Sequence, residues 1–231
     1  MASNSPILCY VTDRRLTGGD ASPDQLLRHI ENAASAGVDW LQIREKDLSA
    51  RELVALTRRA IHAAQAAQNA KPGPHGPLSA PMRVLVNDRL DVAVAAGAAG
   101  VHLGGASIPV AQVVRWRRAG NAPDGFLVGV SCHHLREAIG AERDGADSIF
   151  FGPVYETPSK SSFGAPQGLD KLTEVCRSVR IPVLAIGGIN EENTAACVRA
   201  GAAGIAAIRL FQEQLDSALL ATRISRLRAL F

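Results

Sequence analysis

Several short apolar runs in this sequence end in polar residues whose types suit chemistry. The segment QIREKD, at 42–47, carries Gln42, Arg44 and Lys46 directly after one such run. Alternation along an extended strand places Gln42 and Arg44 on the same side of the chain. Two cations beside an amide could bind an anionic ligand. The alternative is that Glu45 makes a surface ion pair and that the segment binds nothing.

A second apolar run ends in VND, at 86–88. The amide of Asn87 could bind the polar edge of a heterocycle. The carboxylate of Asp88 offers the oxygen ligand that suits Mg²⁺. An Asn-Asp pair also caps turns, which is the alternative interpretation.

Two later segments have the composition of phosphate sites. GPVYETPSK, at 152–160, supplies Thr157, Ser159 and Lys160, whose hydroxyl and ammonium groups could hold a phosphate. AIGGI, at 185–189, puts Gly188 just before a predicted helix, where backbone N–H groups bind anions. Arg209 adds a positive charge after the last apolar run. We therefore expect two anion-binding zones and two phosphorylated ligands. The first zone comprises Arg44, Lys46, Asp88 and Lys160, and the second comprises Gly188 and Arg209.

The polar residues follow eight apolar runs that are predicted as strands, at 7–11, 38–43, 83–87, 99–103, 126–131, 147–151, 181–186 and 203–208. Helical patterns separate them, for example at 22–37, 49–68, 135–145, 169–179 and 190–201. Strict alternation of strand and helix predicts a parallel sheet. Eight such units in a chain of this length predict an α/β fold with a single (β/α)8 TIM barrel. A doubly wound sheet is the alternative, but the first turn lacks its glycine-rich fingerprint.

In such a barrel, catalytic groups stand at the carboxyl ends of the strands. Besides the residues already named, this rule selects Ser131 and His133 after the fifth predicted strand. It also selects His102 and the segment 104–107 at the fourth.

The chain has 231 residues, of which 47% are hydrophobic and 20% are charged. This composition excludes a disordered chain and a small disulfide scaffold. We expect one domain over 1–231, with the proline-rich segment 71–81 as a surface loop. No apolar run reaches the roughly 18–20 residues that a membrane span needs. The first residues also lack the layout of a signal peptide.

The net charge of +3 is too small to indicate nucleic-acid binding. The basic runs at 115–118 and 223–228 are interpreted as solvated helix faces. The four cysteines show no CxxC spacing and are predicted to be reduced and buried, which is typical of a cytoplasmic protein. The expected partners are small-molecule substrates, and a homo-oligomer is compatible with the sequence.

Six motifs, in this order and spacing, resemble those of thiamin phosphate synthase and its close relative, the thiazole tautomerase. They are QIREK, the VND tip, VHLG, GVS, GPVYETPSK and AIGGI. The resemblance runs from about residue 7 to residue 211. It implies a (β/α)8 barrel. It also implies a reaction in which a pyrimidine methyl diphosphate loses pyrophosphate and the resulting cation is captured by the nitrogen of a thiazole phosphate.

The resemblance also implies roles for individual residues. The pyrimidine diphosphate would be held by Gln42, Arg44, Lys46, Asn87, Ser131 and Lys160. The thiazole phosphate would be held by Thr157, Ser159 and Gly188, and Asp88 would be a ligand of the cofactor Mg²⁺. The residues expected to act in catalysis are Arg44, Ser131, His133 and Lys160. Arg209 is expected to bind substrate.

Two positions depart from the family pattern. The family's synthases carry a second acidic Mg²⁺ ligand after VHLG, whereas this chain has Ser107 there. Arg209 stands where the family usually has a small residue or a serine.

Three functions follow in order of preference. The first is thiamin phosphate synthase, a transferase of thiamin biosynthesis. The second is the thiazole tautomerase, which also lacks the second acid and whose proton-transfer histidine matches His133. A histidine at that position could instead pack against the following helix. The third is a non-catalytic ligand-binding barrel of the same family.

Overall fold

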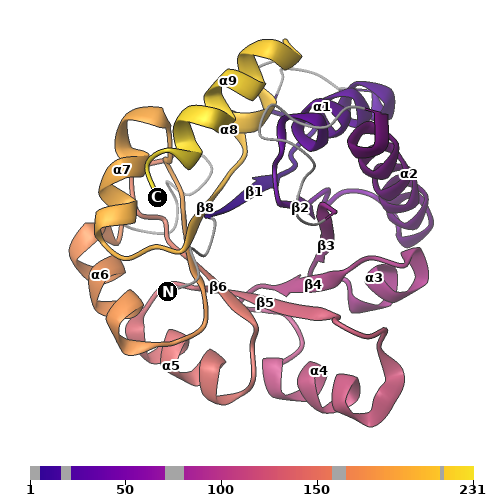
Figure 1. Cartoon of the computed structure of the whole chain (residues 1–231). Coiled ribbons are helices and arrows are strands. Elements are labelled where there is room, and N and C mark those ends of the chain that lie inside the picture. Colours follow the sequence, from indigo (N-terminus) through magenta and orange to yellow (C-terminus); the bar gives the residue numbers. More distant parts are fainter. Residues whose placement is uncertain (1–5, 17–21, 71–80, 158–164, 214–215) are drawn as a thin grey trace.

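Eight parallel strands close into a barrel in the computed structural model, in which each strand pairs with the next and β8 pairs with β1 (Figure 1). The structure describes residues 6–16, 22–70, 81–157, 165–213 and 216–231. The strands are β1 (Ile7–Val11), β2 (Trp40–Ile43), β3 (Arg83–Asn87), β4 (Gly100–Leu103), β5 (Leu127–Cys132), β6 (Ser148–Phe151), β7 (Val183–Ile186) and β8 (Gly204–Ala207). This topology confirms the predicted TIM barrel. The strand bounds differ from the prediction by at most two residues, because periodicity marks the apolar run and not the first ladder bond.

Helices alternate with the strands and surround the barrel (Figure 1). They are α1 (Pro23–Ala36), α2 (Ala50–Ala70), α3 (Leu90–Ala96), α4 (Val110–Trp116) with the π-helical turn η1 (Arg117–Asn121), α5 (Leu135–Arg143), α6 (Gly168–Ser178), α7 (Glu191–Arg199), α8 (Arg209–Gln212) and α9 (Ser217–Arg228). Local sequence explains where α1 begins and ends: Ser22 accepts a hydrogen bond from the Gln25 amide, and Gly37 ends the helix at φ 91°. The predicted loop at 71–81 lies outside the described residues, apart from Pro81. No helix in the described ranges is long and apolar enough to cross a membrane.

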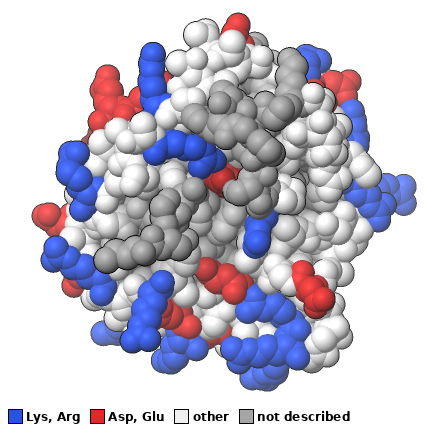
Figure 2. All heavy atoms as spheres, in the orientation of Figure 1, with Lys and Arg blue, Asp and Glu red and all other residues white. Residues whose placement is uncertain are grey.

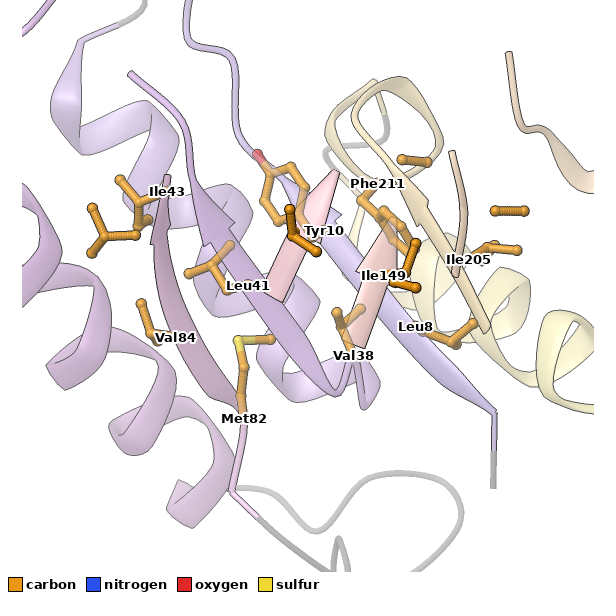
Figure 3. Packing of buried hydrophobic residues seen from close by; sticks show 14 of the residues in the cluster. Leu8, Tyr10, Val38, Leu41, Ile43, Met82, Val84, Ile149, Ile205 and Phe211 are labelled. Carbon is orange, nitrogen blue, oxygen red and sulfur yellow. The ribbon is translucent and has the colours of Figure 1, made fainter. Parts of the chain in front are cut away.

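Apolar side chains pack in two layers because successive residues of a strand face opposite sides of the sheet. Inside the barrel, Cys9 and Val11 pack with Phe150, Leu184 and Ala206. Outside it, alternate strand residues form a larger cluster with the helices, part of which Figure 3 shows around Leu8, Tyr10 and Leu41. The interior side chains at the carboxyl ends of the strands are therefore the ones that can face a ligand.

Three arginines of the basic runs are partly buried, so the prediction of purely solvated helix faces is wrong for them. Arg117 pairs with Asp147, Arg223 with Glu191 at 2.6 Å, and Arg228 with Asp39 at 2.8 Å. Arg117 and Arg228 also donate to backbone carbonyls, and both of their carboxylate partners stand just before a strand. Arg117 and Arg228 therefore connect their helical segments to the starts of strands, and Arg223 connects α9 to the start of α7. Around the visible face of the molecule, acidic side chains lie among the basic ones (Figure 2).

The four cysteines are free thiols, and Cys9, Cys132 and Cys197 are buried as predicted. Cys176 is only half-buried. Burial raises the pKa of the Cys176 and Cys197 thiols to about 11, so both are protonated near neutral pH.

Candidate active site

A cavity of about 1050 Å³ opens where the strands end and the following loops begin. Of the twelve residues to which the sequence analysis assigns a binding or catalytic role, the ten that the structure describes all line this cavity: Gln42, Arg44, Lys46, Asn87, Asp88, Ser131, His133, Thr157, Gly188 and Arg209. Ser159 and Lys160 lie outside the described residues. The cavity is large enough for two small ligands at once. The fold thus brings the described residues of both predicted anion-binding zones into one space, while the roles of the single residues stay predictions.

Two amide side chains from neighbouring strands meet at the base of the cavity. Gln42 of β2 is 3% exposed, and its Nε2 donates to Oδ1 of Asn87 on β3 over 2.9 Å. Within the described part of the chain, the Gln42 Oε1 and Asn87 Nδ2 atoms have no partner. An acceptor and a donor are therefore available side by side. This pair is complementary to a ring edge that carries an amino group next to a ring nitrogen.

The segment after β2 is held in place by an ion pair between Glu45 and Arg14. The Glu45 carboxylate accepts from the backbone N–H of Arg14 and pairs with Arg14 Nη1, all at 3.2 Å. Burial raises the pKa of Glu45, and hydrogen bonds from Thr12 and Arg14 oppose that rise. The ion pair considered as the alternative thus exists, but it is buried and does not involve the neighbouring cations. Toward the described residues, the side chains of Arg44 and Lys46 form no ion pair.

Asp88 adopts a left-handed backbone conformation, with φ 65°, at the tip of β3. Its N–H donates to the His102 carbonyl over 2.8 Å, and the Arg89 N–H donates to the Asn87 carbonyl over 2.8 Å. A non-glycine residue in this conformation is uncommon and concentrates at functional sites. The tight turn points the exposed carboxylate of Asp88 at the cavity wall.

Ser107 lies beside Asp88 in the cavity lining. Its hydroxyl donates to Asp88 Oδ1 and accepts from the Gly104 N–H at 2.6 Å. In the described ranges the Asp88 carboxylate accepts no backbone N–H, so capping a turn does not explain it. No cluster of three or more His, Cys, Asp or Glu side chains occurs in those ranges either. A cation at Asp88 would need oxygen ligands from a substrate or from water.

Two histidines differ sharply in their surroundings. His102 of β4 is 2% exposed, its Nε2 lies 2.9 Å from the Ser131 Oγ, and burial lowers its pKa to about 3. His133 lines the cavity and its Nδ1 contacts the Gly152 carbonyl. Because a carbonyl only accepts, Nδ1 of His133 carries a proton. The sequence rule placed His102 at a strand end, but gave it no role.

The second anion zone forms where β7 meets the loop after β6. Gly188 has φ 67°, and a Cβ there would stand 2.5 Å from the Glu156 carbonyl oxygen and 2.7 Å from the Tyr155 Cβ. Only glycine fits this position. Its amide has no partner within the described ranges. Arg209, the first residue of α8, is 54% exposed and only loosely paired with Glu213 at 3.7 Å. An unpaired amide and a cation therefore face the cavity beside Thr157.

Comparison with known proteins agrees with the motifs. The family model described as thiamine monophosphate synthase matches residues 8–211. A relative from Geobacter sulfurreducens is 43% identical over 201 residues, covering 87% of this chain and 84% of that protein. A protein of Roseiflexus castenholzii named thiamine-phosphate synthase is 40% identical over 206 residues, covering 89% of this chain and 81% of the relative.

A solved structure shows the same fold over almost the whole chain. The thiamine phosphate pyrophosphorylase from Pyrococcus furiosus superposes with a TM-score of 0.76 and 29% identity, covering 98% of this chain and 96% of that one. The family model, the relatives and the barrel thus agree, and the chain belongs to the thiamine monophosphate synthase family.

Proposed function

We propose that this protein is a thiamin phosphate synthase, a transferase that couples a hydroxymethylpyrimidine diphosphate with a thiazole phosphate. The observation that carries the proposal is the single cavity that holds both anion zones. The Gln42–Asn87 pair and the cations Arg44 and Lys46 lie in the same space as Gly188 and Arg209. The names of the relatives support the same reaction.

The reaction divides naturally between the two zones. The Gln42–Asn87 pair would bind the amino-substituted edge of the pyrimidine, and Arg44 and Lys46 would neutralise its diphosphate. The bond between the pyrimidine methylene carbon and the diphosphate oxygen breaks, and pyrophosphate leaves with the electron pair. The thiazole nitrogen then donates its lone pair to the methylene cation. Fixed cations at the departing oxygens lower the barrier, because negative charge develops there.

Mg²⁺ is proposed as the cofactor, with Asp88 as its carboxylate ligand. The donor set fits, since Mg²⁺ is commonly held by one or two carboxylates together with substrate phosphates and water. Ser107 engages Oδ1 of Asp88, and the other oxygen has no partner in the described ranges. When bound, the ion would neutralise charge on the diphosphate. The chain's own contribution is the turn that presents Asp88 to the cavity.

Purified protein with Mg²⁺ and both substrates should release pyrophosphate and form thiamin phosphate. The variants Arg44→Ala and Lys46→Ala should each slow the coupling, whereas Arg136→Ala, an exposed cation on α5, should not. Binding of both substrates without pyrophosphate release by folded protein would indicate a non-catalytic barrel and contradict the proposal.

The thiazole tautomerase is the second candidate, and the geometry of His133 favours it. With Nδ1 bound to the Gly152 carbonyl, the neutral ring offers Nε2 as a base within the cavity. A tautomerase should lose about 10²- to 10⁴-fold in rate on His133→Ala, as general acid–base catalysis predicts. A synthase given the correct thiazole tautomer should lose less than about tenfold. Assaying both reactions with this variant separates the two functions.

The proposed compartment is the cytoplasm. Free thiols that are mostly buried suit a reducing environment.

A further inference from the structure

His102, a buried histidine next to the cavity, can influence how the cavity binds an anion. The identity of that anion as a diphosphate rests on the proposed function. His102 forms a hydrogen bond with one residue of the cavity lining, Ser131, whose Oγ lies 2.9 Å from the His102 Nε2. Its ring packs against Phe150 with ring centroids 4.1 Å apart, so the imidazole is fixed in place. Ser131 lines the cavity, whereas His102 does not. His102 thus touches two lining residues, Phe150 and Ser131, and of these two the Ser131 hydroxyl is the one that can hydrogen-bond a ligand.

The two ring nitrogens of His102 have unequal surroundings. Nδ1 is buried and has no hydrogen-bond partner within the described ranges. A neutral imidazole carries one proton, which is on either Nδ1 or Nε2. A proton on Nδ1 would be a buried donor without an acceptor, a costly arrangement that is rare in proteins. A proton on Nε2 can be donated to Ser131 Oγ, which lies 2.9 Å away. The contacts thus favour the Nε2–H tautomer.

Gly129 and Ser148 border the Nδ1 side of the ring. A Cβ at Gly129 would stand 2.8 Å from His102 Nδ1 and 3.2 Å from Ser148 Oγ, so both atoms border the same small volume. Ser148 is also buried and without a partner in the described ranges. A serine hydroxyl can donate to a bare ring nitrogen or accept from an N–H, but Ser148 Oγ makes neither bond with Nδ1 within the described residues. The choice of tautomer therefore rests on the contact between Nε2 and Ser131.

We propose that His102 is a positioning residue whose Nε2–H donates to Ser131, so that the Ser131 hydroxyl proton is directed into the cavity toward the diphosphate of the substrate. A hydroxyl has one proton and two lone pairs. When one lone pair of the Ser131 oxygen accepts the Nε2–H of His102, the hydroxyl proton of Ser131 is not used in the bond to His102. It can then be donated to the ligand. Ser131 thereby becomes a dedicated donor to an anion, in the cavity that Arg44 and Lys46 also line.

The tautomer can be measured directly in the ligand-free protein. Long-range proton–nitrogen spectra of protein labelled with ¹⁵N at histidine distinguish a protonated ring nitrogen from a bare one, and His102→Gln assigns the signal. We expect Nε2 to carry the proton at pH 7.5. A proton on Nδ1 would overturn the proposal, whatever reaction the protein catalyses.

Binding of inorganic pyrophosphate, measured by calorimetry at fixed Mg²⁺, tests the effect on the ligand. Ser131→Ala should weaken binding by about tenfold or more, the usual effect of losing a hydrogen bond to a charged group. A glutamine amide reaches the position of Nε2 and an asparagine amide that of Nδ1. His102→Asn should therefore weaken binding nearly as much as Ser131→Ala, and His102→Gln should recover most of that loss.

The double variant distinguishes positioning from a general structural effect. If His102 acts through Ser131, His102→Asn should change pyrophosphate binding less than twofold in the Ser131→Ala background. An undiminished effect in that background would overturn the proposal. Wild-type protein that binds no pyrophosphate would overturn the assignment of the anion and the proposed function together, while the nitrogen spectra still decide the tautomer.

Discussion

Arg14 and Glu45 form an ion pair between successive loops of the barrel, with Nη1 and Oε2 3.2 Å apart. The Glu45 side chain is 2% exposed. The same guanidinium contacts both carboxylate oxygens of Asp47. Arg14 therefore holds two alternate residues of the segment 44–47. The other two residues, Arg44 and Lys46, line the cavity and form no ion pair with a described residue.

Removing Arg14 should destabilise the protein strongly. Arg14→Ala leaves the Glu45 carboxylate buried without its cation, and losing one partner of a buried pair costs about 3–5 kcal/mol. We expect a fall of that order in the free energy of unfolding, measured with urea. The KM for the pyrimidine diphosphate should rise as well, because Arg44 and Lys46 lose their support.

Arg15 provides the matched control. It also pairs with Asp47, at 2.8 Å, but is 67% exposed. An exposed pair contributes about 0–1 kcal/mol, so Arg15→Ala should change the unfolding free energy by no more than that. Equal losses in the two variants would show that burial of Glu45 is not what makes the pair matter.

Ser107 should limit how tightly Mg²⁺ binds. Ser107→Asp places a second carboxylate beside Asp88, so half-maximal coupling should require less Mg²⁺. Asp88→Asn should nearly abolish coupling, because the other described carboxylate that lines the cavity, Glu45, is engaged by Arg14. Activity measured across a Mg²⁺ titration tests both variants, with Ser107→Ala as the control for loss of the hydroxyl. Full activity of Asp88→Asn would show that Mg²⁺ is not bound at this position.

Arg209 should act on one substrate only. Arg209→Ser removes a cation from the zone that also contains Gly188 and Thr157. We expect the KM for the thiazole phosphate to rise about tenfold, while the KM for the pyrimidine diphosphate changes less than twofold. Steady-state kinetics with each substrate varied in turn measures the two constants. Equal changes in both constants would contradict the assignment of Arg209 to the second zone.

The sequence predicts the location of the site better than it predicts the hydrogen bonds and ion pairs within it. Apolar runs and the strand-end rule place the ten described candidates around one cavity, because closing a parallel barrel brings all carboxyl ends together. Hydrogen bonds across the barrel are different. Glu45 accepts a hydrogen bond from Arg14, 31 residues away, and the His102 ring forms a hydrogen bond with Ser131, 29 residues away. Such pairs depend on barrel register, which no local pattern specifies.

The basic runs illustrate the same limit. Helical periodicity correctly indicates helices at 115–118 and 223–228, but it does not show that Arg117 and Arg228 reach carboxylates at the starts of strands. Ser107 shows the converse case. The sequence reveals that an acid is missing, and only the fold reveals that the serine binds Asp88.

His29, a buried histidine of α1, should make the protein less stable in mild acid. It is buried, and both of its ring nitrogens lack partners in the described ranges. Burial lowers its pKa below the usual 6.5, and the charge of Arg28 adds to this effect. The unfolded chain therefore binds a proton that the folded chain does not. Stability is full above pH 6.5 and falls as pH decreases below it, by at most about 1.4 kcal/mol per pH unit from this group.

The variant His29→Leu should remove this part of the pH dependence. Urea unfolding at pH 7.5 and pH 5.0 measures it, and the loss between the two should be smaller in the variant than in the wild type. His102, whose pKa is also lowered, contributes a loss of the same sign that both proteins share, so the difference reports on His29. His62 on α2 is exposed, and His62→Gln should leave the wild-type slope unchanged. Parallel pH profiles of wild type and His29→Leu would contradict the prediction, because they would show that protonation of His29 does not affect the free energy of unfolding.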